Sequence, residues 1–242
     1  LVNFACHPTC LYSVWLWSAD YPGPLREAVE AALPGSLFLF ANAPAGDLSP
    51  DRGPNAPAKE SPIDFTRRMG TELGCGAAAA LTTASPLAAG PLRAASETLH
   101  IPQRRVTAEQ IALSQAYLAA RAKGETPPGF CQQAYGYAYH FRHLSATVDD
   151  WLAEDLLGMW EWQKRVGARV PTEDIEVQVL ALGELAVVGV PCELFSDFGH
   201  QIRAQSPFKQ TVVIELANGW HGYVPSAAGV ARGGYESALA YQ

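Results

Sequence analysis

The chain has 242 residues, of which 48% are hydrophobic and 17% are charged. This balance allows a sizeable buried core and excludes wholesale disorder, and the length suggests one large domain or one domain with an insertion. With 17 Lys and Arg against 24 Asp and Glu, the net charge is −7, which argues against a nucleic-acid partner because there is no excess of positive charge to bind phosphates.

No stretch of the sequence has the length and hydropathy of a membrane span. The two most apolar stretches, 180–190 and 77–92, are interrupted by Glu184 or by Gly and Pro. Neither reaches the roughly 20 apolar residues that a spanning helix needs. The chain opens with Leu1 and runs directly into a strand-like segment, without the charged and apolar regions of a signal peptide. We therefore interpret the sequence as a fragment or a processed form of a longer protein.

Strand-like and helical segments alternate along the chain, which predicts an α/β fold with a mixed, layered sheet and flanking helices. In chain order, the patterns of apolar residues and of helix and turn signals predict a strand at 2–6, a helix at 25–33, a strand buried on both faces at 36–41, a long loop at 42–57, a helix with small residues on one face at 65–81 and an edge strand at 92–106.

The second half of the chain continues the alternation. Thr107 is the expected N-cap of a helix at 108–123, and Gly124 is its expected stop. A long helix is predicted at 147–165, with Thr147 or Asp149 as its cap. The remaining patterns predict a hairpin of strands 175–182 and 184–190 around Gly183, a helix at 192–205 and a strand at 211–216.

Polar residues follow four of the predicted strands at the point where each strand ends. These are His7, the segment 42–49, Glu193 and the segment 218–223. Because ligands bind beyond the carboxyl ends of strands in α/β sheets, strands of one sense would bring these four clusters to one edge. The pattern therefore predicts an active site at the C-terminal ends of the strands.

Taken singly, each of these residues also has a purely structural explanation. His7 could simply end a strand, and Glu193 could be an acid favoured at a helix N-terminus. Asp47 and Ser49 could be turn residues, and Tyr223 could be a packed aromatic with a satisfied hydroxyl. The argument for a site depends on their occurring together.

Several of these segments resemble the neutral/alkaline, non-lysosomal ceramidases. Phe-Ala-Cys-His-Pro-Thr at 4–9 and Gly-Asp-Leu-Ser-Pro-Asp at 46–51 are similar to that family's catalytic segments, the second to its hexapeptide Gly-Asp-Val-Ser-Pro-Asn. Val-Pro-Cys-Glu-Leu-Phe at 190–195 is similar to the segment that carries its glutamate zinc ligand. Leu-Ala-Asn-Gly-Trp-His-Gly-Tyr at 216–223 resembles its tyrosine-ligand segment, and a Tyr-Glu pair follows at 235–236. The segment 77–170 carries little of the likeness.

The resemblance implies a zinc-dependent hydrolase that cleaves the amide bond of an N-acylated, ceramide-like substrate, giving a sphingoid base and a fatty acid. Carried over residue by residue, it implies that His7, Glu193 and Tyr223 bind Zn2+. It implies that Ser49 is the serine essential for amide cleavage and that Tyr235 polarises the scissile carbonyl.

The same resemblance implies further properties of the whole protein. Residues 1–242 would be the C-terminal portion of the catalytic domain of a shorter, bacterial-type relative, with a first histidine ligand upstream. It also implies a small amphiphilic substrate, access to that substrate at a membrane surface, and a secreted or periplasmic location.

Other functions and roles are also consistent with the residues. Ser49 could be a direct nucleophile, the substrate bond could be an ester, or the protein could be a non-catalytic module that binds a lipid or a carbohydrate. His140 and His143 are three residues apart and could bind a metal, although the aromatic residues around them favour a packed surface. The five cysteines include no CxxC pair, so they fit neither a disulfide framework nor a cysteine zinc site.

Overall fold

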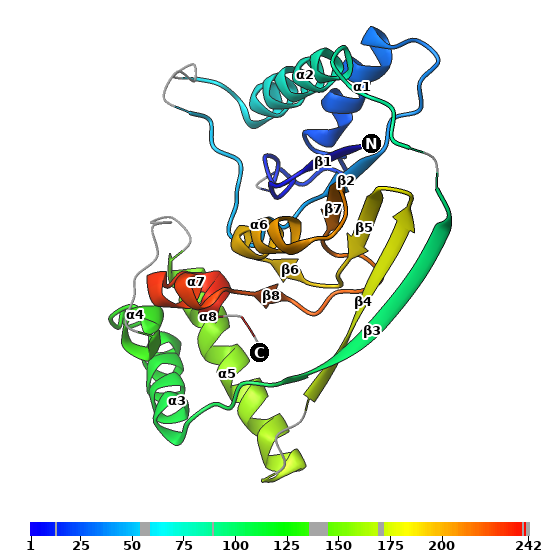
Figure 1. Cartoon of the computed structure of the whole chain (residues 1–242). Coiled ribbons are helices and arrows are strands. Elements are labelled where there is room, and N and C mark those ends of the chain that lie inside the picture. Colours follow the sequence, from blue (N-terminus) through cyan, green and yellow to red (C-terminus); the bar gives the residue numbers. More distant parts are fainter. Residues whose placement is uncertain are drawn as a thin grey trace. The chain divides into compact units, whose positions relative to one another are not determined.

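The computed structural model describes residues 1–12, 14–53, 59–88, 90–135, 145–168, 172–238 and 240. Helices and strands alternate, which confirms the mixed α/β fold with flanking helices (Figure 1). The elements are β1 (Val2–Phe4), α1 (Pro22–Ala32), β2 (Phe40–Asn42), α2 (Pro62–Leu81), β3 (Leu92–Pro102), α3 (Ala108–Ala122), α4 (Phe130–Tyr135), α5 (Ser145–Val166), β4 (Thr172–Leu182), β5 (Leu185–Gly189), β6 (Glu193–Leu194), α6 (Ser196–Gln205), β7 (Gln210–Ile214), β8 (Tyr223–Val224), α7 (Ala227–Arg232) and α8 (Tyr235–Ala238).

The chain divides into two compact units. The first unit combines Leu1–Ser96 with Gln178–Gly219, and the second combines Glu97–Val177 with Trp220–Gln242. Within the described ranges, no helix has both the length and the hydropathy needed to cross a membrane.

Parallel strand pairs form the centre of the first unit. β1 pairs in parallel with β2, and β5 pairs in parallel with β7. The side chain of Asn3 joins the two pairs, because its Nδ2 donates to the carbonyl oxygens of Ala41 at 3.1 Å and Val213 at 2.9 Å. The parallel pairing gives each pair one common sense, which is the arrangement that brings strand ends to one edge.

The predicted hairpin and edge strand are both confirmed. β4 pairs antiparallel with β5, and Gly183 at the turn has φ 56°, a left-handed conformation that glycine adopts without the steric cost of a Cβ. The sheet order is β3-β4-β5-β7, so β3 lies at the edge. β3 ends at Pro102, which cannot donate a further ladder hydrogen bond.

Two helices, α1 and α2, cover β1 and β2 in the first unit (Figure 1). Tyr21, Leu25 and Phe65 form the buried centre of this cluster. The small residues predicted on one face of α2 let the helices approach closely: a Cβ on Gly70 would lie 2.4 Å from the carbonyl oxygen of Tyr21, and one on Gly74 would lie 2.6 Å from Ala28 Cβ.

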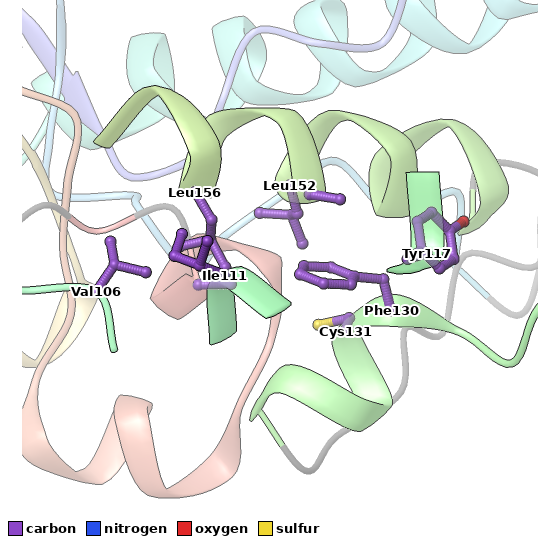
Figure 2. Packing of buried hydrophobic residues seen from close by; sticks show 9 residues of the cluster. Val106, Ile111, Tyr117, Phe130, Cys131, Leu152 and Leu156 are labelled. Atoms are coloured by element: carbon purple, nitrogen blue, oxygen red, sulfur yellow. The ribbon is translucent and has the colours of Figure 1, made fainter. Parts of the chain in front are cut away.

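The second unit has its own hydrophobic core between α3, α4 and α5. Figure 2 shows Phe130 among Tyr117, Leu152 and Leu156, all of them buried. α3 begins with the predicted cap: Thr107 accepts from the backbone N–H of Gln110, whose side chain accepts from the Thr107 N–H in return. This reciprocal capping satisfies two helix-end donors and fixes where α3 starts.

The expected boundaries of α1 and β2 were wrong. α1 starts at Pro22 rather than at 25, because proline is suited to the first helical turn, where no backbone N–H is needed. The strand expected at 36–41 is β2, and only its three residues pair with β1. Leu37 and Leu39 are exposed, so the apolar run is not buried on both faces.

Two helices also start elsewhere than expected. α5 starts at Ser145, and Asp149 is not its cap; its carboxylate accepts from the backbone N–H of Cys131 at 2.8 Å. The helix expected at 192–205 starts at Ser196, and Glu193 lies in the short strand β6 before it. Glu193 is therefore not the acid of a helix N-terminus.

We predict that Phe130→Ala lowers the free energy of unfolding by about 3–5 kcal/mol, because it removes a large side chain from a packed core. Phe130 is 0% exposed. Chemical denaturation of the purified protein measures this change. Trp151→Ala on α5 is the control, since Trp151 is 53% exposed and its loss should change stability by less than about 1 kcal/mol. Equal effects of the two substitutions would contradict the described core.

Candidate active site

Three of the four predicted polar clusters meet beyond the strand ends of the first unit. His7 follows β1, the loop 42–48 starts at the last residue of β2, and Glu193 follows β5. The backbone N–H of His7 donates to Leu48 O at 3.1 Å, and that of Gly46 donates to Leu194 O at 2.8 Å. The loop therefore holds both neighbouring segments by main-chain hydrogen bonds.

His7 and Glu193 face each other at this edge. His7 Nε2 lies 3.5 Å from Glu193 Oε2, and each side chain is 12% exposed. Burial lowers the pKa of His7, and the neighbouring Glu193 opposes that shift. A lowered pKa favours the neutral imidazole, which is the form that binds metal ions.

Gly46 and Asp47 of the hexapeptide have structural roles in this arrangement. A Cβ on Gly46 would lie 2.5 Å from Glu193 O, so only glycine allows the two backbones to approach this closely. The Asp47 carboxylate accepts from the backbone N–H of Ser196 at 2.6 Å and from its hydroxyl at 3.1 Å. Asp47 thus caps α6, whose own N-cap residue makes no side-chain cap, and is more than a turn residue.

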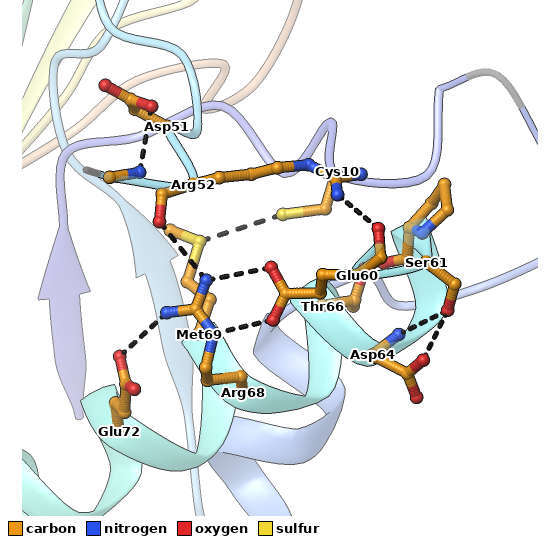
Figure 3. A network of polar contacts seen from close by, with 12 residues as sticks. Cys10, Asp51, Arg52, Glu60, Ser61, Asp64, Thr66, Arg68, Met69 and Glu72 are labelled. Carbon is orange, nitrogen blue, oxygen red and sulfur yellow. Dashed lines mark hydrogen bonds and ion pairs between the residues drawn. The ribbon is translucent and has the colours of Figure 1, made fainter. Parts of the chain in front are cut away.

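Ser49 of the hexapeptide is exposed, and the chain after it is held against α2. Arg68 on α2 makes two hydrogen bonds to the Glu60 carboxylate, at 2.7 and 3.0 Å, and a third to Arg52 O at 3.2 Å (Figure 3). Arg52 in turn donates to Glu60 O. Both guanidinium groups also lie over the ring of Phe65, at 5.3 and 5.4 Å from its centroid.

Glu215 was not predicted as a functional residue, and the structure places it in the same region. It follows β7, is 2% exposed, and accepts from Asn42 Nδ2 at 2.5 Å and from the backbone N–H of Ala45 at 3.0 Å. Burial, followed by the charges of Glu193 and Asp47, raises its pKa to about 7. The available sequence signal was a single acidic residue in the apolar run Thr-Val-Val-Ile-Glu-Leu at 211–216.

The remaining two predicted site residues lie in the second unit and contact each other. The Tyr223 and Tyr235 hydroxyl oxygens are 3.4 Å apart, and their rings meet edge to face with centroids 5.9 Å apart. His221, two residues earlier, has its Nδ1 2.5 Å from the Glu173 carboxylate.

Other candidate ligands and nucleophiles gain no support. Among the described residues, no group of three or more His, Cys, Asp or Glu is arranged to hold a metal ion, and His140 and His143 lie outside those residues. The pKa of the Cys6 thiol is raised to about 11 and that of Cys10 to about 12, chiefly by burial. Thiols with such pKa values are poor nucleophiles near neutral pH.

We predict that Gly46→Ala disrupts the approach of the loop 42–48 to Glu193, because the added Cβ meets backbone atoms that cannot rotate away. The expected loss is about 1–3 kcal/mol in unfolding free energy. Gly76→Ala on α2 is the matched control, since its Cβ would meet no atom within 4 Å. Alanine there should be neutral or stabilising by up to about 1 kcal/mol. A Gly46→Ala protein as stable as Gly76→Ala would contradict the contact.

Glu215 should make stability fall as the pH rises. Its pKa in the folded state, about 7 against an ordinary 4.5, means that the folded protein holds this proton more tightly than the unfolded chain does. Stability is therefore lost between roughly pH 4.5 and 7, by up to about 3 kcal/mol. Denaturation of the wild type and of Glu215→Gln between pH 4.5 and 8 isolates this contribution. A pH-independent difference between the two would contradict the raised pKa.

Comparison with protein-family models and with curated proteins gives no match for this sequence. Solved structures do match. A neutral ceramidase from Pseudomonas aeruginosa is 19% identical with a TM-score of 0.60, and the match covers 98% of this chain and 40% of that chain. A ceramidase complexed with C2 is 18% identical with a TM-score of 0.60, covering 98% of this chain and 41% of that one. The chain therefore has a ceramidase-like fold and spans about two fifths of the length of these structures.

Proposed function

We propose that the protein is a zinc-dependent amidohydrolase that cleaves the amide bond of a ceramide-like, N-acylated substrate. The observation that carries this proposal is the distance of 3.5 Å between His7 Nε2 and Glu193 Oε2, at strand ends fastened by the loop that leads to Ser49. The ceramidase-like fold supports it.

The spacing of His7 and Glu193 fits two ligands of one metal ion. Zinc binds histidine nitrogen and carboxylate oxygen at about 2.0–2.2 Å in near-tetrahedral geometry, which places two ligand atoms about 3.4 Å apart. We propose Tyr223 as a further ligand. Bound zinc would lower the pKa of a coordinated water toward ~7 and polarise a carbonyl group.

Ser49 and Tyr235 would act on the substrate carbonyl. We propose that the exposed Ser49 hydroxyl and the Tyr235 hydroxyl donate hydrogen bonds to the carbonyl oxygen as negative charge develops on it. The loss of one such donor typically costs about 3–4 kcal/mol of transition-state stabilisation.

We further propose an amphiphilic substrate taken up at a membrane surface by a secreted or periplasmic protein. One surface feature of the first unit supports the membrane-surface part: Trp15 and Trp17 are fully exposed on either side of the exposed Leu16. Tryptophan favours the interface between water and lipid, where its ring is apolar and its N–H is hydrated.

Glu193→Gln should abolish fatty-acid release from a short-chain ceramide by the full-length protein and reduce its zinc content. The reason is that the amide removes the charge that would bind the cation. Release should also stop with a chelator and return with added zinc. Glu184→Gln is the matched control, because Glu184 is a partly exposed residue of the same unit whose side chain pairs with Lys209 at the surface. Full activity of Glu193→Gln would contradict the proposed ligand.

Other outcomes separate the alternative functions. Zinc binding without fatty-acid release would point to another acylated substrate, which a panel of amides and esters would identify. An acyl adduct on Ser49 trapped by hydroxylamine would make Ser49 the nucleophile. If the protein neither binds zinc nor releases fatty acid, the remaining alternative is a non-catalytic module that binds a lipid or a carbohydrate.

A further inference from the structure

Glu215 is a buried acid that the proposed reaction does not use. Its two carboxylate oxygens accept from two different parts of the loop 42–48: Oε1 from the side chain of Asn42 at 2.5 Å and Oε2 from the backbone N–H of Ala45 at 3.0 Å. Its own backbone N–H donates to Asn42 O at 3.0 Å. One residue thus makes three hydrogen bonds to the start of the loop.

We propose that Glu215 is the positioning residue that fixes the loop 42–48, and through it the Ser49 hydroxyl, relative to His7 and Glu193. This inference rests on the proposed function, because Ser49 and the two ligands are assigned there. Glu215 acts through the loop and has no contact of its own with the substrate in this scheme.

The path from Glu215 to the proposed ligands is short and consists mainly of backbone. Ala45, which Glu215 holds, is followed by Gly46, whose N–H donates to Leu194 O beside Glu193 at 2.8 Å. Two residues later, Leu48 O accepts from the His7 N–H at 3.1 Å, and Ser49 comes next. Release of Ala45 would therefore loosen the segment that bonds to both ligand-bearing strands.

The surroundings of Glu215 indicate that its carboxyl is costly to bury. The acidic groups that face it, Asp47 and Glu193, are of like charge, and the buried Tyr21 also lies near it. An unpaired carboxyl in such a site is unfavourable unless hydrogen bonds stabilise it. Two donated bonds, one of them from a backbone group that needs a buried acceptor, supply that stabilisation.

We expect Glu215→Gln to keep the hydrogen bonds that hold the loop, because the side-chain amide of Asn42 can rotate. Its Oδ1 is buried and has no hydrogen-bond partner among the residues that the structure describes. A glutamine oxygen would accept from the Ala45 N–H, and the Asn42 amide, rotated by half a turn, would present Oδ1 to the glutamine NH2. The hydrogen bond that holds Ala45 would then be kept, and the glutamine NH2 would have an acceptor in Asn42 Oδ1.

The test compares Glu215→Ala, Glu215→Asp and Glu215→Gln in the full-length protein, with kcat expressed per bound zinc. We expect Glu215→Ala to lower kcat by 10–100-fold with KM within threefold of wild type, because a displacement of about 1 Å at the reacting groups costs on the order of 100-fold. Glu215→Asp, one methylene shorter, should also lower kcat, and Glu215→Gln should stay within threefold. Glu184→Ala is the control, because Glu184 is a partly exposed glutamate of the same unit that pairs with Lys209 at the surface.

Hydrogen exchange of the backbone amides in 42–48 provides a readout that does not depend on activity. Exchange should be at least tenfold faster in Glu215→Ala than in wild type and unchanged in Glu215→Gln. Wild-type kcat per zinc in Glu215→Ala would overturn the proposal. If that variant does not fold, wild-type kcat with unchanged exchange in Glu215→Asp would do the same.

Failure of the proposed function would be seen separately. A wild-type protein that releases no fatty acid removes the catalytic role of the loop, and faster exchange in Glu215→Ala would then show a structural anchor alone. An active wild type with unchanged exchange in Glu215→Ala removes Glu215 as the anchor and leaves the proposed function standing.

Discussion

The candidate site depends on the close approach of two backbones, the loop 42–48 and the segment 193–196. Gly46 lies so near Glu193 that a single Cβ would meet its carbonyl oxygen at 2.5 Å. The neighbouring Asp47 spans the same contact with its carboxylate, which binds the first turn of α6. Gly46 thus allows the loop to approach closely, and the negative charge of Asp47 binds the N-terminus of α6.

The docking of this loop buries backbone polar groups that must find hydrogen-bond partners. The loop leaves the β1–β2 pair after Ala43, whose N–H still donates to Phe4 O, so the backbone N–H groups that follow need other acceptors. Glu215 accepts from one of them and Leu194 O from another. The turn after β7 also contains Leu216 and Asn218 with φ values of 55° and 68°, a region that non-glycine residues seldom adopt. Such local strain is commonly retained at functional sites.

The sequence predicted the alternation of elements and the meeting of His7, Glu193 and the loop, because both follow from local patterns and from the rule on strand ends. It did not predict Glu215, Arg68 or Ser196, whose roles depend on partners far along the chain. Glu215 and Asn42, for example, are separated by 173 positions. The boundary errors have the same origin: Leu37 and Leu39 look like core residues until it is known that β1 pairs only with Phe40–Asn42.

Backbone hydrogen bonds hold the two segments that carry His7 and Glu193. His7 is held through Leu48 O and Glu193 through the bond between Gly46 and Leu194, so one loop serves as the common frame for both. Two side chains on segments held in this way are already close together before a cation binds. Such preorganisation reduces the entropy that would be lost on binding. The hexapeptide fits this account: its Gly46 and Asp47 build the frame, and its Ser49 is left exposed.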